Sequence, residues 1–569
     1  MTDDTPTASE NPYENPQVVD DPPIRRWPLF PPVWVWVLFA FFVVLVGLVR
    51  VREVSGDRAI VNILTLILSF LACNVLGLWF LFLSGYSRSL RWKTIAAFTG
   101  ALICFFSAFK IDHVTGELVP VFRCRWQPPR DAQLEQPDVA SNSPAIDLQT
   151  TTDQDFPQFL GPHRDGQLDG PLLETDWQTH PPQELWRQPI GAGWSSFAAV
   201  NGFAVTIEQR GEEEIVSCYR VATGELVWAH SETTRHSTVM GGVGPRSTPT
   251  IHEGKVYTLG ATGNLLCLDG SDGEIVWQDN VLTRYGVTPE EDIKSVAWGR
   301  AGSPLIVDDL LVVPSGGPAN GKKVSLAAFN KDTGELVWEA GDRQVSYSSP
   351  VLADLLGKRQ IVLVNENNVS AHAPTTGEEL WQHAWPGASN TEASVANPQI
   401  VGENRVLLSK HYGKGAVVLE LVTDTAGVVG TKEVWAEKVV LKTKFTNVIV
   451  HDGHAYALSD GILECVDVES GKRRWKRGRY GQGQVLRVGE LILVQAESGE
   501  VAMVALSPSK FTELSKFQAI EGQTWNNLCL YGDLLLVRNA EEAACYRLAT
   551  RSPVDAMPEG PAPEANPPE

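Results

Sequence analysis

The sequence lacks the residue patterns of the common catalytic and metal sites. Its eight cysteines are scattered, with no two adjacent and no CxxC pair, so zinc-ligand spacing is absent. No HExxH, P-loop or GxSxG motif occurs. Positive charge is also scarce, because 47 Lys and Arg stand against 68 Asp and Glu and give a net charge of -21. Binding to nucleic-acid phosphates needs a basic face, so we expect no nucleic-acid partner.

The length of 569 residues exceeds one ordinary core, so several domains or one large repetitive fold are expected. Residues 1–32, rich in Pro, Asp, Glu and Asn, predict a disordered tail, and the Pro-rich residues 549–569 predict another. Residues 112–155 carry Pro and Asp and predict a linker. Residues 156–183 are interpreted as a segment that leads into the repeats.

Three uncharged apolar runs, at about 33–49, 59–83 and 94–109, predict transmembrane helices within residues 33–111. As helices they would extend about 26, 37 and 24 Å against a bilayer core of about 30 Å. The first run follows Arg25 and Arg26, as in a signal peptide, but no small-residue cleavage site follows and two more runs do. Lys and Arg in the flanking segments number five on one side and six on the other, which leaves the orientation open.

A six-residue word recurs in the rest of the chain. It reads TGELVW up to Trp228 and Trp338, DGEIVW up to Trp277, TGEELW up to Trp381 and SGKRRW up to Trp475. Its Gly supplies the positive φ of a tight turn, and Asp, Ser or Thr can hydrogen-bond the turn backbone. Eight hairpins of alternating apolar strands and Gly, Asp or Asn turns accompany the words.

This periodicity predicts an all-β, eight-bladed β-propeller over residues 184–548, with four-stranded blades, preceded by three N-terminal transmembrane helices. The outer-strand markers are Trp186, Trp228, Trp277, Trp338, Trp381, Trp435, Trp475 and Phe517. Trp186 has no hairpin before it, and the final hairpin, which ends in AACYRLAT, has no Trp after it. We therefore expect the N-terminal strand to close the last blade, which leaves no free sheet edge in the ring.

The runs AFNKDTGELVW and CLDGSDGEIVW resemble the tryptophan-docking motif of the pyrroloquinoline-quinone (PQQ) repeat family. The preceding DFPQFLGPHRDG resembles a segment found before such propellers in membrane-anchored bacterial proteins. The resemblance implies that each Trp stacks on the turn of the neighbouring blade and is structural. One branch of the family is the BamB-type outer-membrane protein assembly factor, which is non-enzymatic and binds proteins. The other is the quinoprotein alcohol dehydrogenases, which bind PQQ and calcium.

The dehydrogenase branch implies a vicinal Cys-Cys disulfide, and a calcium ion held by Glu and Asn near an Asp base. The chain has no Cys-Cys pair, and no residues are assigned to that calcium set. The acidic residues of DGSDGE belong to an outer turn, where they cap the turn backbone. We therefore expect no cofactor, no metal and no catalytic residue, with PQQ and calcium as the open alternative.

One face of the propeller carries the more distinctive loops, where first strands begin and second strands end. Its candidate residues are Trp194, Arg246, Arg300, Tyr347, Lys444, Tyr480, Trp525 and Asn526 at strand starts, and Glu208, Arg210 and His411 in the second-to-third loops. Aromatic residues and Arg are favoured at the centres of binding surfaces. The alternative is that these side chains pair with one another in the central channel.

The leading hypothesis is a protein-interaction or assembly scaffold, anchored in the inner membrane by three helices, with a periplasmic propeller. Its loop face would take a protein partner or an acidic ligand. Two alternatives remain: a quinoprotein-like oxidoreductase of the PQQ-dependent alcohol dehydrogenase type, and a small-ligand sensor.

Overall fold

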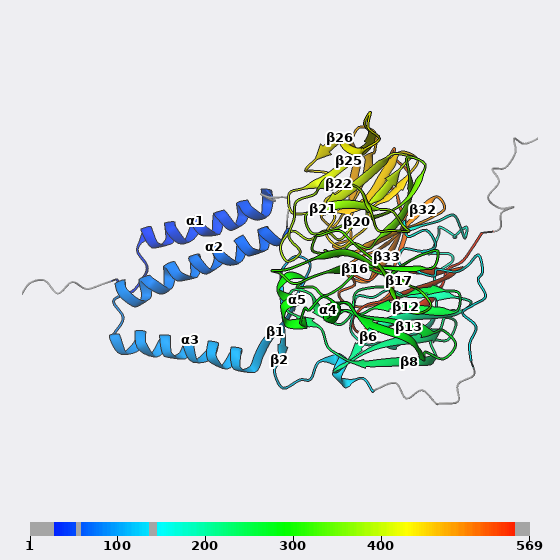
Figure 1. The fold of residues 1–569 in the computed structure, drawn as a ribbon. Coiled ribbons are helices and arrows are strands. Elements are labelled where there is room, and N and C mark those ends of the chain that lie inside the picture. Colours follow the sequence, from blue (N-terminus) through cyan, green and yellow to red (C-terminus); the bar gives the residue numbers. More distant parts are fainter. Residues whose placement is uncertain (1–27, 53–57, 136–144, 552–569) are drawn as a thin grey trace, which may run out of the picture. The chain divides into compact units, whose positions relative to one another are not determined.

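The computed structural model of the chain describes residues 28–52, 58–135 and 145–551. The predicted tails at 1–32 and 549–569 lie mostly outside the described residues. The chain divides into two compact units, Met1–Ser107 and Ala108–Glu569. In Figure 1 the first unit is helical and the second is rich in strands.

Three helices make up most of the described part of the first unit. They are α1 (Val33–Arg52), α2 (Arg58–Leu78), which a π-helical turn extends (Trp79–Leu83), and α3 (Arg88–Ala108). α1 packs against α2. Large apolar side chains such as Phe41, Phe70 and Phe98 are exposed on these helices.

Two stretches of the described residues, Val33–Val51 and Arg58–Leu83, are long and apolar enough to cross a membrane, by length and composition alone. α3 differs because Arg88, Arg91 and Lys93 occupy its first two turns. The uncharged remainder of α3 would extend only about 22 Å. The third predicted span is therefore not confirmed.

The second unit contains the predicted eight-bladed propeller, built from antiparallel sheets. Blade 1 comprises β5 (Ala198–Val200), β6 (Phe203–Arg210), β7 (Glu213–Arg220) and β8 (Leu226–Thr233), and blade 2 comprises β11 (Thr250–His252), β12 (Lys255–Leu259), β13 (Asn264–Asp269) and β14 (Ile275–Asn280). Blade 3 comprises β15 (Leu305–Val307), β16 (Leu310–Gly316), β17 (Val324–Asn330) and β18 (Leu336–Ala340). Blade 4 comprises β19 (Val351–Leu355), β20 (Lys358–Val364), β21 (Asn368–His372) and β22 (Glu379–Ala384). Blade 5 comprises β23 (Gln399–Val401), β24 (Arg405–Lys410), β25 (Gly415–Thr423) and β26 (Val429–Glu437), and blade 6 comprises β27 (Ile449–His451), β28 (His454–Ser459), β29 (Ile462–Asp467) and β30 (Arg473–Arg479). Blade 7 comprises β31 (Gln484–Val488), β32 (Leu491–Gln495), β33 (Glu500–Ala505) and β34 (Glu513–Gln518). Blade 8 comprises β35 (Cys529–Tyr531), β36 (Leu534–Arg538), β37 (Glu542–Arg547) and β4 (Gln183–Pro189).

Shorter elements lie between the blades and before the ring. They are β1 (Phe109–Val114), β2 (Pro120–Cys124), a 3-10 helix (Arg130–Gln133), β3 (Gln167–Leu168), β9 (Ser237–Thr238), β10 (Gly242–Val243), α4 (Val281–Arg284) and α5 (Pro289–Ser295). β1 and β2 form a hairpin, and so do β9 and β10. Part of the range predicted as a linker is therefore a hairpin and a helical turn.

The N-terminal strand closes the ring, as predicted. β4 pairs with β37 in register, so that Trp186 lies opposite Cys545. The apolar core lies between neighbouring blades: Val205 of blade 1, for example, belongs to the same buried cluster as Val256 of blade 2. Each blade thus covers the apolar face of the next.

The docking tryptophans link each blade to its neighbour. The indole nitrogen of Trp277 donates a hydrogen bond to the carbonyl of Lys331 in the next blade, at 2.8 Å. The ring lies so close to Gly334 that a Cβ at that glycine would come within 2.7 Å of it. Trp186, Trp228, Trp338 and Trp435 use the same pair of contacts, and Trp475 makes the corresponding hydrogen bond.

Two positions make no tryptophan hydrogen bond to the next blade. Trp381 faces the long β25–β26 hairpin and donates instead to Gln360 of its own blade, at 2.7 Å. In blade 7 the β-bulge register places Ser515, and not Phe517, at the docking position. The next blade closes with a separate strand and has no glycine turn leading into it, so no docking tryptophan is needed there.

A belt of hydrogen bonds joins the blades around the channel, two residues before each innermost strand. Five backbone N–H groups each donate to the side-chain oxygen at the equivalent position of the next blade, at 2.8–3.2 Å. These N–H groups belong to Ser196, Thr248, Ser303, Ser349 and Asn397. These bonds fix the segments that enter the innermost strands. They therefore also fix the side chains that those segments direct into the channel.

A segment ahead of the ring crosses the channel. Phe156 pairs with Ala199 of blade 1, and the carbonyl of Pro157 accepts from Ile251 of blade 2. The buried guanidinium of Arg164 donates to the carbonyls of Ser303 and Pro304 at 3.0 and 2.8 Å, and burial lowers its pKa to about 9. β3 then runs parallel to β31 of blade 7. This segment, residues 156–168, therefore contacts innermost strands or their approaches on several sides of the ring.

Candidate functional site

A pocket of about 110 Å³ lies where the eight innermost strands begin. Every blade contributes to it; the lining residues are Phe159, Trp194, Met240, Gly241, Arg246, Trp298, Ala301, Tyr347, Val395, Phe445, Asn447, Gln484, Trp525 and Asn527. In seven blades a lining residue stands four positions before the innermost strand, as Trp194 does before β5 and Trp525 before β35. Phe159 adds a contact from the segment that crosses the channel.

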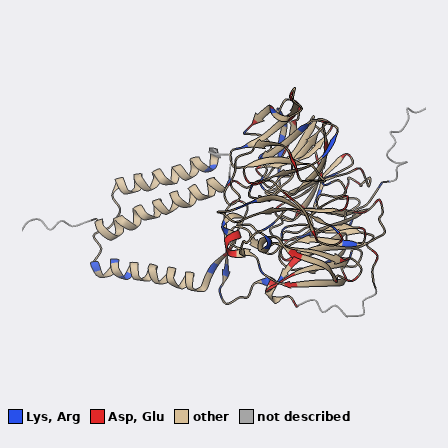
Figure 2. Ribbon diagram, viewed as in Figure 1, with Lys and Arg blue, Asp and Glu red and all other residues tan. Residues whose placement is uncertain are grey.

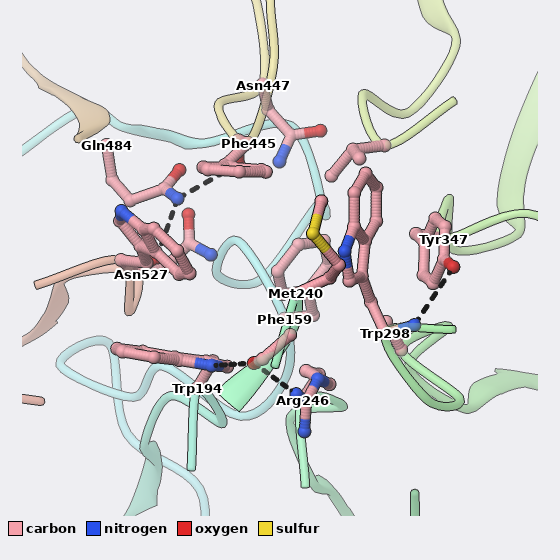
Figure 3. Close-up of a pocket in the computed structure, with 14 residues that line it drawn as sticks. Phe159, Trp194, Met240, Arg246, Trp298, Tyr347, Phe445, Asn447, Gln484 and Asn527 are labelled. Atoms are coloured by element: carbon pink, nitrogen blue, oxygen red, sulfur yellow. Dashed lines mark hydrogen bonds between the residues drawn. The ribbon is translucent and has the colours of Figure 1, made fainter. Parts of the chain in front are cut away.

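Five aromatic rings of the pocket lining form a wall of successive contacts. Figure 3 labels four of them, Trp194, Phe445, Trp298 and Tyr347. The ring centres of Trp194 and Trp525 are 4.7 Å apart, and those of Trp525 and Phe445 are also 4.7 Å apart. Phe445 meets Trp298 edge-on at 6.2 Å, and Trp298 lies 4.9 Å from Tyr347. Aromatic pairs at these separations stabilise one another, so the wall keeps its shape.

Arg246 is the charged residue of the pocket lining. Its Nη2 group donates to the carbonyl of Gly241, which also accepts from the indole nitrogen of Trp194 at 2.9 Å. Nη1 is buried and has no hydrogen-bond partner, and no carboxylate of a described residue forms an ion pair with this arginine. Burial lowers the pKa of Arg246 to about 10, so the side chain stays charged near neutral pH. A half-buried cation with a buried, free donor nitrogen favours a carboxylate or another strong acceptor.

The remaining polar groups of the lining are amides. Gln484 donates to the carbonyls of Phe445 and Trp525 at 2.9 and 2.7 Å, and its own side-chain oxygen has no partner. Asn447 and Asn527 also face the pocket. Aromatic surface with one cation and a few amides fits a single apolar or acidic side chain better than a large charged cofactor.

The structure brings four of the predicted residues into contact with the pocket: Trp194, Arg246, Tyr347 and Trp525. Arg300 and Lys444 stand one position away from lining residues, Ala301 and Phe445, and successive side chains of an extended segment point to opposite sides. Arg300 instead forms a buried, bidentate ion pair with Asp292 of α5, at 2.6 and 3.0 Å.

Tyr480 and Asn526 also serve the scaffold. The Tyr480 hydroxyl donates to Glu513 at 2.5 Å, and the ring belongs to the core shared with Trp475. Asn526 donates to the carbonyl of Ser195 at 2.8 Å and so ties blade 8 to blade 1.

The predicted loop residues lie in buried networks. Glu208 is fully buried and accepts from Ser217 at 2.6 Å, Tyr219 at 2.8 Å and Arg210 at 3.0 Å. Burial opposes its charge, but Arg210 and Arg538 outweigh burial and keep the pKa of Glu208 below its usual value. His411 is buried with Nε2 3.5 Å from a carboxylate oxygen of Asp460. These groups connect loops of neighbouring strands and blades and do not line the pocket.

Sequence reasoning missed Trp298, Phe445, Met240 and Phe159. The position four residues before the innermost strand would have found Phe445, because the same count leads to Trp194, Tyr347 and Trp525. Met240 comes from the β9–β10 insertion and Phe159 from the segment before the ring, and no repeat carries either of them.

This architecture is similar to that of known proteins. Residues 212–477 match the sequence model of a family described as outer membrane protein assembly factor BamB. The chain is 23% identical to BamB of Yersinia pestis over 302 residues, which are 51% of this chain and 66% of that protein. The propeller is therefore similar to the PQQ-like β-propellers. Within that class it resembles BamB.

Quinoprotein dehydrogenases are also similar. The dehydrogenase subunit of a quinone alcohol dehydrogenase from Gluconacetobacter polyoxogenes is 26% identical over 125 residues, 21% of this chain and 16% of that protein. The structure of quinohemoprotein alcohol dehydrogenase from Comamonas testosteroni superposes with a TM-score of 0.50 at 14% identity, over 72% of this chain and 82% of that one. At this identity the structural likeness shows the fold alone. The chain spans less than two thirds of each of these two sequence relatives.

Proposed function

We propose that the chain is a membrane-anchored docking module whose propeller binds a protein partner through the aromatic pocket. The observation that carries this proposal is the aromatic wall beside the unpaired donor of Arg246. Aromatic and Arg side chains in a desolvated pocket are the usual anchors of protein interfaces. The partner would insert an apolar or acidic side chain.

The apolar stretches of α1 and α2 support anchoring in a membrane, and the similarity to BamB supports a protein partner. We further propose that the chain is a multi-pass inner-membrane protein with its propeller in the periplasm. The same proposal includes α3 as a third membrane span. Single cysteines placed in the segments before and after α3 would report its topology through labelling by an impermeant reagent. Labelling on the same side before and after α3 would rule out a third span.

Site-specific photo-crosslinking tests the docking site. A photoreactive amino acid at Val395, which lines the pocket from blade 5, should give adducts with a partner in the native membrane. The same amino acid at Glu490, on an exposed turn at the other end of a blade, should not. Arg246→Gln and Trp525→Ala should reduce the adducts at position 395 without lowering the melting temperature much. Equal adducts at both positions, or adducts that neither substitution changes, would refute the assignment.

A quinoprotein oxidoreductase is the second candidate, because a quinone alcohol dehydrogenase subunit is among the similar proteins. The lining residues do not fit a calcium–PQQ pair, since they offer amide oxygens but no carboxylate. We propose that the pocket takes neither group. Stoichiometric PQQ binding in the presence of calcium, with reduction of a dye by an alcohol, would reverse this ranking.

A further inference from the structure

The β1–β2 hairpin, residues 109–124, lies at the rim of the aromatic pocket. The N–H of Gly116 donates to Glu497 at 3.3 Å, and Lys444 donates to the carbonyl of Gly116 at 3.4 Å. On one side of this turn, Val114 donates to the carbonyl of Val239 at 3.2 Å. The turn therefore contacts blade 6, blade 7 and the β9–β10 hairpin.

Each of these rim residues is next to, or bonded to, a residue that lines the pocket. Val239 precedes Met240, and Lys444 precedes Phe445. The Glu497 carboxylate that accepts from Gly116 also accepts from the indole nitrogen of Trp525, at 2.9 Å. The turn thus occupies the polar rim beside the aromatic wall.

The fit of the turn depends on a glycine. A Cβ on Gly116 would come within 2.9 Å of Gln482 and of Glu497, although the backbone of Gly116 is not in the left-handed region. Its hydrogen bonds to the rim are longer than the usual 2.9–3.0 Å. The contact is therefore specific in shape and weak in its bonds, as expected for an occupant that can leave.

We propose that the rim formed by Lys444, Gln482 and Glu497 is a binding site for a β-turn, that the hairpin 109–124 is its resident occupant, and that a partner protein reaches the aromatic pocket by displacing it. This proposal rests on the proposed docking function. The partner would present a turn with a small residue at its tip beside the side chain that enters the pocket. Because Phe109 directly follows Ala108 of α3, displacement would also release the segment that leads to the membrane helices.

The hairpin itself supplies the probe. A labelled peptide of residues 109–124 can be closed by a disulfide between Cys124 and a Phe109→Cys substitution, because these positions pair in register. In the full-length protein, Gly116→Val should exclude the resident turn by its clash with Gln482 and Glu497. Gly430→Val is the control, since Gly430 likewise has no positive φ and its nearest neighbour is 4.0 Å from an added Cβ.

The peptide should bind the Gly116→Val protein at least ten times more tightly than the parent or the Gly430→Val protein, because the tethered hairpin competes at a high effective concentration. Lys444→Ala in the Gly116→Val protein should abolish this gain, and a peptide that carries Gly116→Val should not bind. Equal binding of the peptide to the parent and Gly116→Val proteins would overturn the proposal. Binding that is unchanged by Lys444→Ala in the protein, or by Gly116→Val in the peptide, would overturn it as well.

A locked hairpin tests the displacement. A Cβ on Gly116 would lie 3.3 Å from the Gln482 Cβ, close to the spacing of a disulfide, so Gly116→Cys with Gln482→Cys should hold the turn in place. The oxidised variant should lose the peptide and the photo-adducts at position 395, whereas Gly116→Val should increase the adducts. Unchanged adducts in the locked variant would refute displacement. Absence of adducts in every variant would instead refute the proposed function, while the peptide results would still decide on the turn site.

Discussion

Removal of one docking tryptophan measures how strongly the blades are joined. In Trp277→Ala the indole ring, which is only 8% exposed, is lost together with its hydrogen bond to Lys331. Burial of about 200 Å² of ring surface is worth up to about 5 kcal/mol. Trp→Ala substitutions in cores cost about 3–5 kcal/mol, and we expect this range. The measurement is urea unfolding of the full chain in detergent, followed by near-UV circular dichroism.

A control on the same strand isolates the docking contact. Val276→Ala removes a side chain that is 42% exposed, so it should change the free energy of unfolding by at most about 0.5 kcal/mol. Gly334→Ala should also be destabilising, through its clash with Trp277 and through its φ of 72°. In the double variant the clash is gone, and the two costs should sum to less than their separate values. A cost below about 1 kcal/mol for Trp277→Ala, or strictly additive costs, would refute the stacking argument.

Three further changes test other features. A chain that starts at Gly191 lacks β4, so the free edge of β37 should cause self-association in sedimentation; a monomer that melts like the parent would contradict the closure. Burial raises the pKa of Glu214 to about 7, so the free energy of unfolding should fall by about 3 kcal/mol as the pH rises from 4.5 to 7. Unfolding measured across this pH range should lose the fall in the Glu214→Gln variant. Arg300→Ala leaves Asp292 buried without its partner and should cost about 3–5 kcal/mol in the same unfolding assay, whereas Arg246→Gln should cost far less; similar costs would show that both arginines serve only the scaffold.

The repeats predicted the propeller because seven of the eight blades carry a tryptophan on the outer strand and five of them carry the turn glycine on which such a tryptophan stacks. Phe517 does lie on the outer strand of blade 7, as predicted, but the bulge there places Ser515 at the register position that a docking tryptophan has in the other blades. Four predicted pocket residues were found from strand starts alone. Arg300 and Lys444 were misplaced by a single position, which reverses the direction of a side chain in an extended segment. The β1–β2 hairpin lies outside the repeats, so no periodic pattern could locate it on the rim.

The strand that closes the ring determines when the ring can form during synthesis. Arg187 and Tyr546, which are hydrogen-bonded across blade 8, are 359 residues apart in the chain. The entropy cost of joining ends at that separation is about 5 kcal/mol before any constant term. Blade 8 cannot be completed until β37 has been made, after every strand of the other seven blades. The unfinished ring must therefore wait for β37, with β4 free to pair with other strands.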